Sequence, residues 1–220
     1  MFEEELKYVQ DYLISHNGDN SPRINETFRH RSKHVNNVFR WALRIYNELD
    51  YLLQAKIDQN ALYLACIFYD VGYGSEHFHN SHPIEGADIW KEYAISKHFD
   101  TELIDYVYYL IRMHSNKELL QNKNTPLELV ILMEADWLDE EGAMSICWDL
   151  ITLGHENPKA YDEALNKLEK YSAHILNTNP LVTIPGRKFW SEKQALVANF
   201  IKELNISFDS FIVVLYNIVR

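Results

Sequence analysis

The chain has 220 residues, of which 47% are hydrophobic and 24% are charged, and its formal net charge is −11. This length and composition are those of a globular protein that can bury a sizeable core. The negative charge disfavours a broad surface for nucleic-acid phosphates, although a small phosphorylated substrate could bind if a metal ion supplied local positive charge.

Neither a membrane span nor a signal peptide is expected. No apolar run approaches the roughly 20 residues that a span needs, and the acidic opening MFEEELKYVQ lacks a basic n-region and an apolar stretch. We therefore expect a cytoplasmic protein that binds neither a membrane nor extended nucleic acid.

Helices are predicted throughout the first half of the chain. Glycine and proline are scarce, with 7 and 6 residues, whereas Leu, Ala, Glu, Lys and Ile dominate long segments. Hydrophobic periodicity predicts helices over 3–15, from about 28, and over 59–71, the last ended by Gly72 and Gly74. The stretch SEHFHNSH is expected to be a loop, followed by a helix from Pro83 to about residue 96.

The second half of the chain continues the helical pattern. Thr101 is expected to cap one helix, and Pro126 is expected to start the next. Later helices are predicted over roughly 142–153, 158–176 and 187–205, and the apolar tail FDSFIVVLYNIVR is either a final helix or a strand-like segment. The sequence thus predicts an all-α protein.

The two cysteines lie in apolar helical patterns. Such positions favour two buried thiols, at Cys66 and Cys147, over a disulfide bond.

Several polar side chains lie where helix periodicity predicts burial. His34, Asp70 and Asp136 fall on or beside apolar faces, and a buried carboxylate needs a partner. His82 and His114 add two imidazoles. Nitrogen and carboxylate donors together suit Fe, Mn, Co, Ni or Zn better than Ca.

Structural roles also explain these residues. A histidine on an apolar face is more often a satisfied core group than a ligand. Asp70 could accept hydrogen bonds from helix-end amides, and Asp136 could pair with Arg112. The residues alone leave metal binding and structural roles open.

The order of these residues resembles the HD-domain superfamily of metal-dependent phosphohydrolases, whose pattern is a His, a His-Asp pair and a distant Asp. RHRSKHVNNVFRWALRIY resembles the first-ligand helix of that family, with His34 as the ligand. ALYLACIFYDVGYG resembles the central LAALLHDIG helix and LMEADWLDEEGA the closing ADRLDAIGA element, which places Asp70 and Asp136 in the other ligand positions. HNSHPIEGADI and LIRMHS resemble segments that supply extra histidines in two-metal members, at His82 and His114.

The resemblance covers about residues 28–150 and implies an HD-domain-like helical bundle. A weaker likeness to a C-terminal segment of some small bacterial members continues through ILNTNPLVTIPGRKFW. We therefore expect a single domain with a core over about 28–155 and a helical extension over 156–220.

One position departs from the family pattern, because Tyr69-Asp70 stands where the family has His-Asp. A neutral phenol, with a pKa of about 10, is a poor metal ligand. Tyr69 could bind Fe(III) as a phenolate, hydrogen-bond a metal-bound water, or mark a lost ligand. Since the other ligand positions are retained, we expect a metal site with altered affinity or geometry.

The resemblance implies hydrolysis of a nucleotide or another small phosphoester. One or two divalent transition metals would activate water at such a site, with Mg²⁺ as an alternative ion. Asp70 would be a ligand, and a proton could come from the loop residues Glu76, His77 or His79. The candidates for holding phosphate are Arg31, Lys33 and Arg112.

The loop residues and the basic residues could instead be ordinary solvent-exposed side chains with no role in a site. The alternative function is a catalytically silent HD-fold protein that binds a nucleotide or a protein partner, and Tyr69 favours it. A homodimer is left open.

Overall fold

A computed structural model describes residues 2–16, 31–75, 78–156 and 163–218, without the side chains of residues 78–80 and 208–218. Every regular element in the described residues is a helix, which confirms the predicted all-α fold. The chain forms two compact units, residues 1–139 with 181–186 and residues 140–180 with 187–220. The expected single domain with a boundary near residue 155 stays a prediction.

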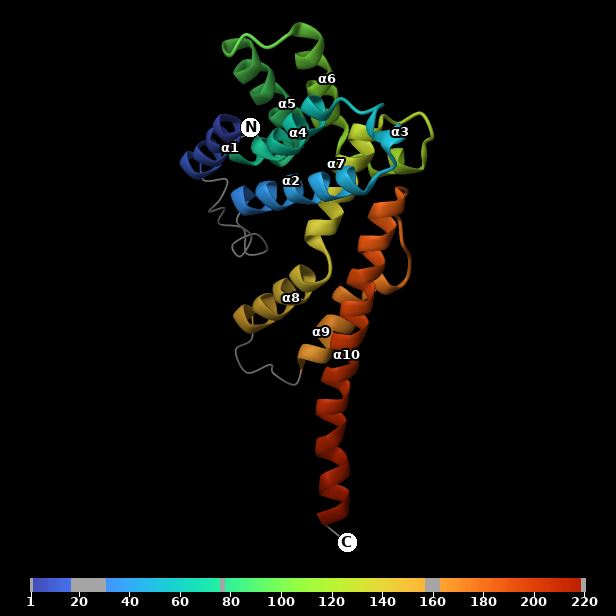
Figure 1. Cartoon of the computed structure of the whole chain (residues 1–220). Coiled ribbons are helices and arrows are strands. Elements are labelled where there is room, and N and C mark those ends of the chain that lie inside the picture. Colours follow the sequence, from blue (N-terminus) through green and yellow to red (C-terminus); the bar gives the residue numbers. More distant parts are fainter. Residues whose placement is uncertain (1, 17–30, 76–77, 157–162, 219–220) are drawn as a thin grey trace. The chain divides into compact units, whose positions relative to one another are not determined.

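The described residues of the first unit form six longer helices and three short helical segments (Figure 1). They are α1 (Glu3–Ser15), α2 (Arg31–Glu48), α3 (Tyr51–Gln54), α4 (Gln59–Phe68), η1 (Val71–Gly74), α5 (Phe78–Ser96), α6 (Thr101–Met113), η2 (Lys117–Gln121) and α7 (Leu127–Glu140).

Helix α4 is the centre of this unit. Every side chain from Ala61 to Phe68 is buried, and α2 and α6 pack against the helix. The Asp58 carboxylate caps its N-terminus by accepting a hydrogen bond from the Ala61 amide at 3.0 Å. A helix that is apolar on all faces needs cover on all sides, as the sequence predicted.

The end of α4 differs from the prediction. The helix stops at Phe68, and both glycines lie in the 3₁₀ turn η1 instead of forming the helix end. A side chain at Gly72 would collide with the backbone of His82 and Gly86. The glycine therefore permits η1 to lie against α5, which brings the end of α4 close to His82.

Helix α5 begins earlier than expected. The stretch predicted as a loop is helical from Phe78, leaves helical geometry at Ser81 (φ −175°, ψ 86°), and resumes at Pro83. Its end at Ser96 agrees with the prediction.

The cap of α6 also differs, because Asp100 and not Thr101 accepts hydrogen bonds from the amides of Glu102 and Leu103, at 2.9 and 3.4 Å. A carboxylate is a stronger acceptor than a hydroxyl for these unpaired amides.

The second unit contains α8 (Ala143–Glu156), α9 (Ala164–Lys170), η4 (Ser172–Leu176) and most of α10 (Ile184–Ile218). The predicted helix over 158–176 is divided into α9 and η4, and residues 157–162 lie outside the described part. The apolar tail continues α10 as helix up to Ile218. None of the described helices has the length and apolarity needed to cross a membrane.

One of the two cysteine thiols is buried, as predicted, and the other is not. Cys66 is buried on α4, whereas Cys147 on α8 is exposed, so the expectation for Cys147 was wrong; both are free. The periodic pattern around Cys147 did place Ile146 inside, and its neighbour falls on the outer side of the helix.

Candidate metal centre

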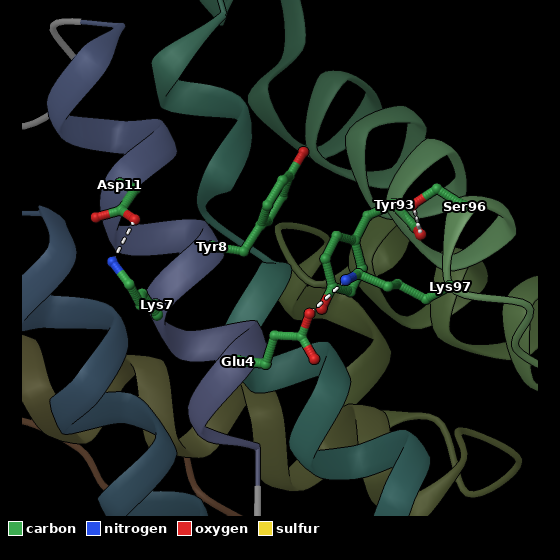
Figure 2. A pocket seen from close by; sticks show the side chains of 7 residues that line it. All are labelled: Glu4, Lys7, Tyr8, Asp11, Tyr93, Ser96 and Lys97. Carbon is green, nitrogen blue, oxygen red and sulfur yellow. Dashed lines mark hydrogen bonds and ion pairs between the residues drawn. The ribbon is translucent and has the colours of Figure 1, made fainter.

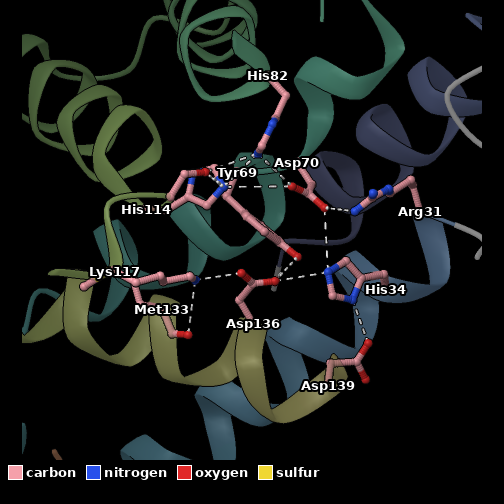
Figure 3. Close-up of polar contacts among 11 residues, drawn as sticks. Arg31, His34, Tyr69, Asp70, His82, His114, Lys117, Met133, Asp136 and Asp139 are labelled. Carbon is pink, nitrogen blue, oxygen red and sulfur yellow. Dashed lines mark hydrogen bonds and ion pairs between the residues drawn. The ribbon is translucent and has the colours of Figure 1, made fainter. Parts of the chain in front are cut away.

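Five polar side chains from separate elements meet at the end of α4 (Figure 3). His34 comes from α2, Asp70 follows α4, His82 lies on α5, His114 follows α6 and Asp136 lies on α7. These are the five residues predicted as metal ligands. The structure thus brings together side chains separated by up to 102 positions in the sequence.

Three of these residues face one another closely. The His82 Nε2 and His114 Nε2 atoms are 3.3 Å apart, and they lie 3.8 and 3.9 Å from the Asp70 Oδ1. Two donor atoms that share one ion, each about 2.1 Å from it, are separated by about 3 to 4.2 Å. The spacing of all three atoms therefore fits a shared transition-metal ion.

The His114 ring is oriented for this role. Its Nδ1 donates to the Ile111 carbonyl at 2.6 Å, which leaves the lone pair of Nε2 directed at Asp70 and His82. Burial lowers the pKa of His114 to about 4 and also lowers the pKa of His82. Both imidazoles are therefore neutral at physiological pH, as metal ligands must be.

His34 has a different electrostatic environment. Its Nδ1 lies 2.7 Å from the Asp139 Oδ2 and its Nε2 lies 3.2 Å from the Asp136 Oδ1. Burial lowers the pKa of His34, but the hydrogen bonds to both carboxylates and the charge of Asp70 outweigh burial and raise it to about 9. In the metal-free chain His34 is a cation between carboxylates.

Asp136 is surrounded by groups of the chain itself. Lys117 Nζ lies 2.8 Å from its Oδ2, and the hydroxyl of the fully buried Tyr69 donates to its Oδ1 at 3.3 Å. Burial alone would raise the pKa of Asp136, but Lys117 and His34 hold it well below its usual range. Tyr69 therefore faces the site, as the family alignment of its helix required.

Arg31, a predicted phosphate-binding residue, is buried and binds Asp70; its role toward phosphate stays a prediction. Its Nη1 donates to the Asp70 Oδ2 at 3.0 Å, and its guanidinium lies 3.8 Å from the centre of the Tyr73 ring, which stacks on His82. Burial raises the pKa of Asp70, and Arg31 and His34 more than reverse this, so the pKa lies below its ordinary value.

The structure does not bring Lys33 or Arg112 into this cluster. Lys33 is exposed on α2, and Arg112 is exposed and donates to the Tyr108 hydroxyl at 3.1 Å. Glu76 and His77 lie outside the described residues, as does the side chain of His79. Their roles stay predictions.

Two residues of the cluster were missed by the sequence interpretation. Asp139 lies three positions after Asp136, so helical spacing places both on one face of α7 and could have revealed it. Lys117 lies in the short turn η2, and no periodic pattern in this turn could have indicated it.

Helix α7 is fixed by a carboxylate next to the cluster. Glu134 is fully buried and accepts hydrogen bonds from the Val182 amide at 2.6 Å and from the Thr183 amide and hydroxyl at 2.8 and 2.5 Å. Charge-assisted bonds of this kind are strong. They hold the helix two residues before Asp136.

A separate hollow of about 390 Å³ lies between α1 and α5 (Figure 2). The rings of Tyr8 and Tyr93 are 4.4 Å apart there, and Lys97 pairs with Glu4. None of the residues lining it was predicted as a site residue. The candidate chemistry of the first unit is thus concentrated at the end of α4.

The HD domain family model matches residues 31–141, which is half of the chain. The chain therefore belongs to the HD-domain family. Its five candidate ligands all lie within the matched segment.

Solved structures share the fold at low sequence identity. The Lin1889 protein of Listeria innocua is 20% identical, with a TM-score of 0.60 over 93% of this chain and 96% of the other. A predicted HD superfamily hydrolase from an uncultured Thermotogales bacterium is 18% identical, with a TM-score of 0.59 over 92% of each chain. YpgQ of Bacillus subtilis, crystallised with ADP, is 14% identical, with a TM-score of 0.59 over 94% and 97%. No curated protein matches the chain.

Proposed function

We propose that this protein is a metal-dependent phosphohydrolase that cleaves a nucleotide or another small phosphoester. The observation that carries the proposal is the mutual approach of Asp70 Oδ1, His82 Nε2 and His114 Nε2 within 3.9 Å. A divalent transition ion of Fe, Mn, Co, Ni or Zn, alone or as one of two, supplies Lewis acidity and a more acidic water when bound. Asp70, His82 and His114 form one candidate ligand group, and His34 and Asp136 are the candidate ligands of a second ion.

The surrounding residues prepare the site for an anionic substrate. Arg31 and Lys117 fix the two carboxylates in position through ion pairs of 3.0 and 2.8 Å. The exposed Ser115 hydroxyl lies 3.3 Å from the His82 Nε2 and 3.2 Å from the His114 Nε2, where it can donate to a phosphoryl oxygen. Glu76, His77 and His79 are the proposed sources of a proton for the leaving oxygen.

A nucleotide is the first substrate to test. YpgQ, a structural neighbour, was crystallised with ADP. The net charge of −11 favours a small substrate, since phosphate must be held by the local cations and the ion and not by a broad basic surface.

A catalytically silent nucleotide-binding protein is the second candidate. Tyr69 stands at a family ligand position, and Lys117 pairs with a carboxylate proposed as a ligand. A site altered in this way could retain binding and lose turnover.

Phosphate release separates the two candidates. Nucleoside mono-, di- and triphosphates and an aryl phosphate are incubated with the protein in Mn²⁺, Co²⁺ or EDTA. We expect turnover with metal, none in EDTA, and a loss of at least about 100-fold in Asp70→Asn, with no change in the exposed control Asp105→Asn. Nucleotide binding by calorimetry without any phosphate release would establish the silent alternative, and equal turnover in EDTA would contradict metal dependence.

A further inference from the structure

The two carboxylates of the metal centre differ in how the chain engages them. Asp136 contacts Lys117 through Oδ2 at 2.8 Å, and its Oδ1 contacts both Tyr69 and His34 at 3.3 and 3.2 Å (Figure 3). Both of its oxygens are therefore occupied by groups of the protein. An ion placed against this carboxylate would be repelled by the Lys117 ammonium.

Asp70 has one oxygen engaged and one directed at the imidazoles. Arg31 binds its Oδ2 at 3.0 Å, whereas its Oδ1 faces His82 and His114, and no hydrogen bond reaches this atom from the residues that the structure describes. Two histidines and one carboxylate make a ligand set that leaves coordination positions open, as is known for Fe(II) and related ions.

We propose that this chain holds one divalent transition ion, on Asp70, His82 and His114, and that Lys117 and Tyr69 replace a second ion between Asp136 and His34. The inference rests on the proposed metal-dependent function and specifies where its metal is held.

Tyr69 and Lys117 each supply one part of what a second ion would give to Asp136. The Tyr69 hydroxyl donates a hydrogen bond to Asp136, where the family pattern has a ligand nitrogen. Lys117 adds a fixed positive charge on the other oxygen, and its Nζ also lies 3.5 Å from the Met133 carbonyl. A permanent ammonium thus supplies the electrostatic support that an ion would otherwise give to the buried carboxylate.

Cobalt binding tests this arrangement without relying on turnover. The full chain is stripped of metal and titrated with Co²⁺ alone, with stoichiometry from calorimetry and coordination followed by visible absorption. We expect one Co²⁺ per parent chain. His82→Gln should weaken binding by at least about 100-fold, and His34→Gln by less than about 10-fold, because only the first removes a ligand.

A second set of variants should restore metal binding between Asp136 and His34. Lys117→Met combined with Tyr69→His removes the ammonium and adds a nitrogen donor, so this double variant is expected to bind two Co²⁺ ions. The matched control is Lys123→Met with Tyr69→His, since Lys123 is exposed, and it should still bind one. Circular dichroism of each variant checks that it is folded.

Each outcome decides the inference. Two Co²⁺ ions in the parent, equal loss in His34→Gln and His82→Gln, or a single ion in the folded double variant would overturn it. One ion lost with His82→Gln but no phosphate release would leave the inference standing and contradict the phosphohydrolase. Metal-dependent turnover with two ions in the parent would support the phosphohydrolase and overturn the single-ion inference. A parent that binds no Co²⁺ would refute both the inference and the metal-dependent function.

Discussion

Gly186 lies directly against the buried carboxylate that fixes α7. A methyl group added at this position would collide with the Glu134 Oε2 and approach the Thr183 hydroxyl to 2.7 Å. Glu134 is 0% exposed and accepts three hydrogen bonds, from the Val182 amide and from Thr183. Because no space surrounds the carboxylate, Gly186→Ala must displace it from at least one or two of these donors.

The cost follows from the lost bonds. A hydrogen bond to a charged group contributes about 1.5–3 kcal/mol, so losing one or two costs about 1.5–6 kcal/mol. Alanine is about 1 kcal/mol more favourable than glycine inside a helix, which offsets part of the loss. We expect Gly186→Ala to lower the free energy of unfolding by about 0.5–5 kcal/mol.

Urea unfolding followed by circular dichroism measures this change. Gly154→Ala is the control, because nothing lies within 4 Å of the new methyl group on α8; it should raise the unfolding free energy by about 0.5–1 kcal/mol. In a Glu134→Ala background, Gly186→Ala should cost much less, since the carboxylate is gone and only the Thr183 hydroxyl still lies close to the new methyl group. A Gly186→Ala variant as stable as the parent, or an equal cost in both backgrounds, would refute the reasoning.

Three further predictions concern other buried groups. Burial raises the pKa of the Cys66 thiol, so one thiol, Cys147, should react with Ellman's reagent in the folded chain and two in denaturant. Tyr106→Phe should cost about 1.5–3 kcal/mol in urea unfolding, because its hydroxyl donates to the buried Glu128 at 2.8 Å. Burial raises the pKa of Asp149 above its ordinary value near 4, so the folded chain takes up this proton more readily than the unfolded chain. Asp149 ionisation therefore lowers the free energy of unfolding of the parent as pH rises through that range. Unfolding measured from pH 4 to 7 should show the stability of Asp149→Asn increasing relative to that of the parent.

Much of the helical fold could be predicted because burial repeats with the helix period. The buried stretch Ala61–Phe68 of α4 and the end of α5 at Ser96 were readable in this way. Gly72 was misread as a helix stop, because its real requirement is a close approach to the backbone of α5, a contact distant in sequence. Local signals cannot report such packing.

The candidate site shows the same division. The order of His34, Asp70 and Asp136 indicated a convergence that no single helix pattern could have shown, and their side chains do meet. Lys117 could not be found in this way, because its ion pair with Asp136 depends on the placement of a short 3₁₀ turn. The family resemblance thus indicated the ligand candidates, whereas the Lys117 ammonium beside Asp136 is visible only in three dimensions.

The most direct test of the metal centre is the anomalous diffraction map of a crystal grown with Co²⁺. The account predicts one strong peak, about 2.0–2.3 Å from the Asp70 Oδ1, His82 Nε2 and His114 Nε2. A peak bound to His34 and Asp136 with Lys117 displaced would contradict the position that we infer. A map with no peak at any of the five candidate ligands would contradict the metal centre itself.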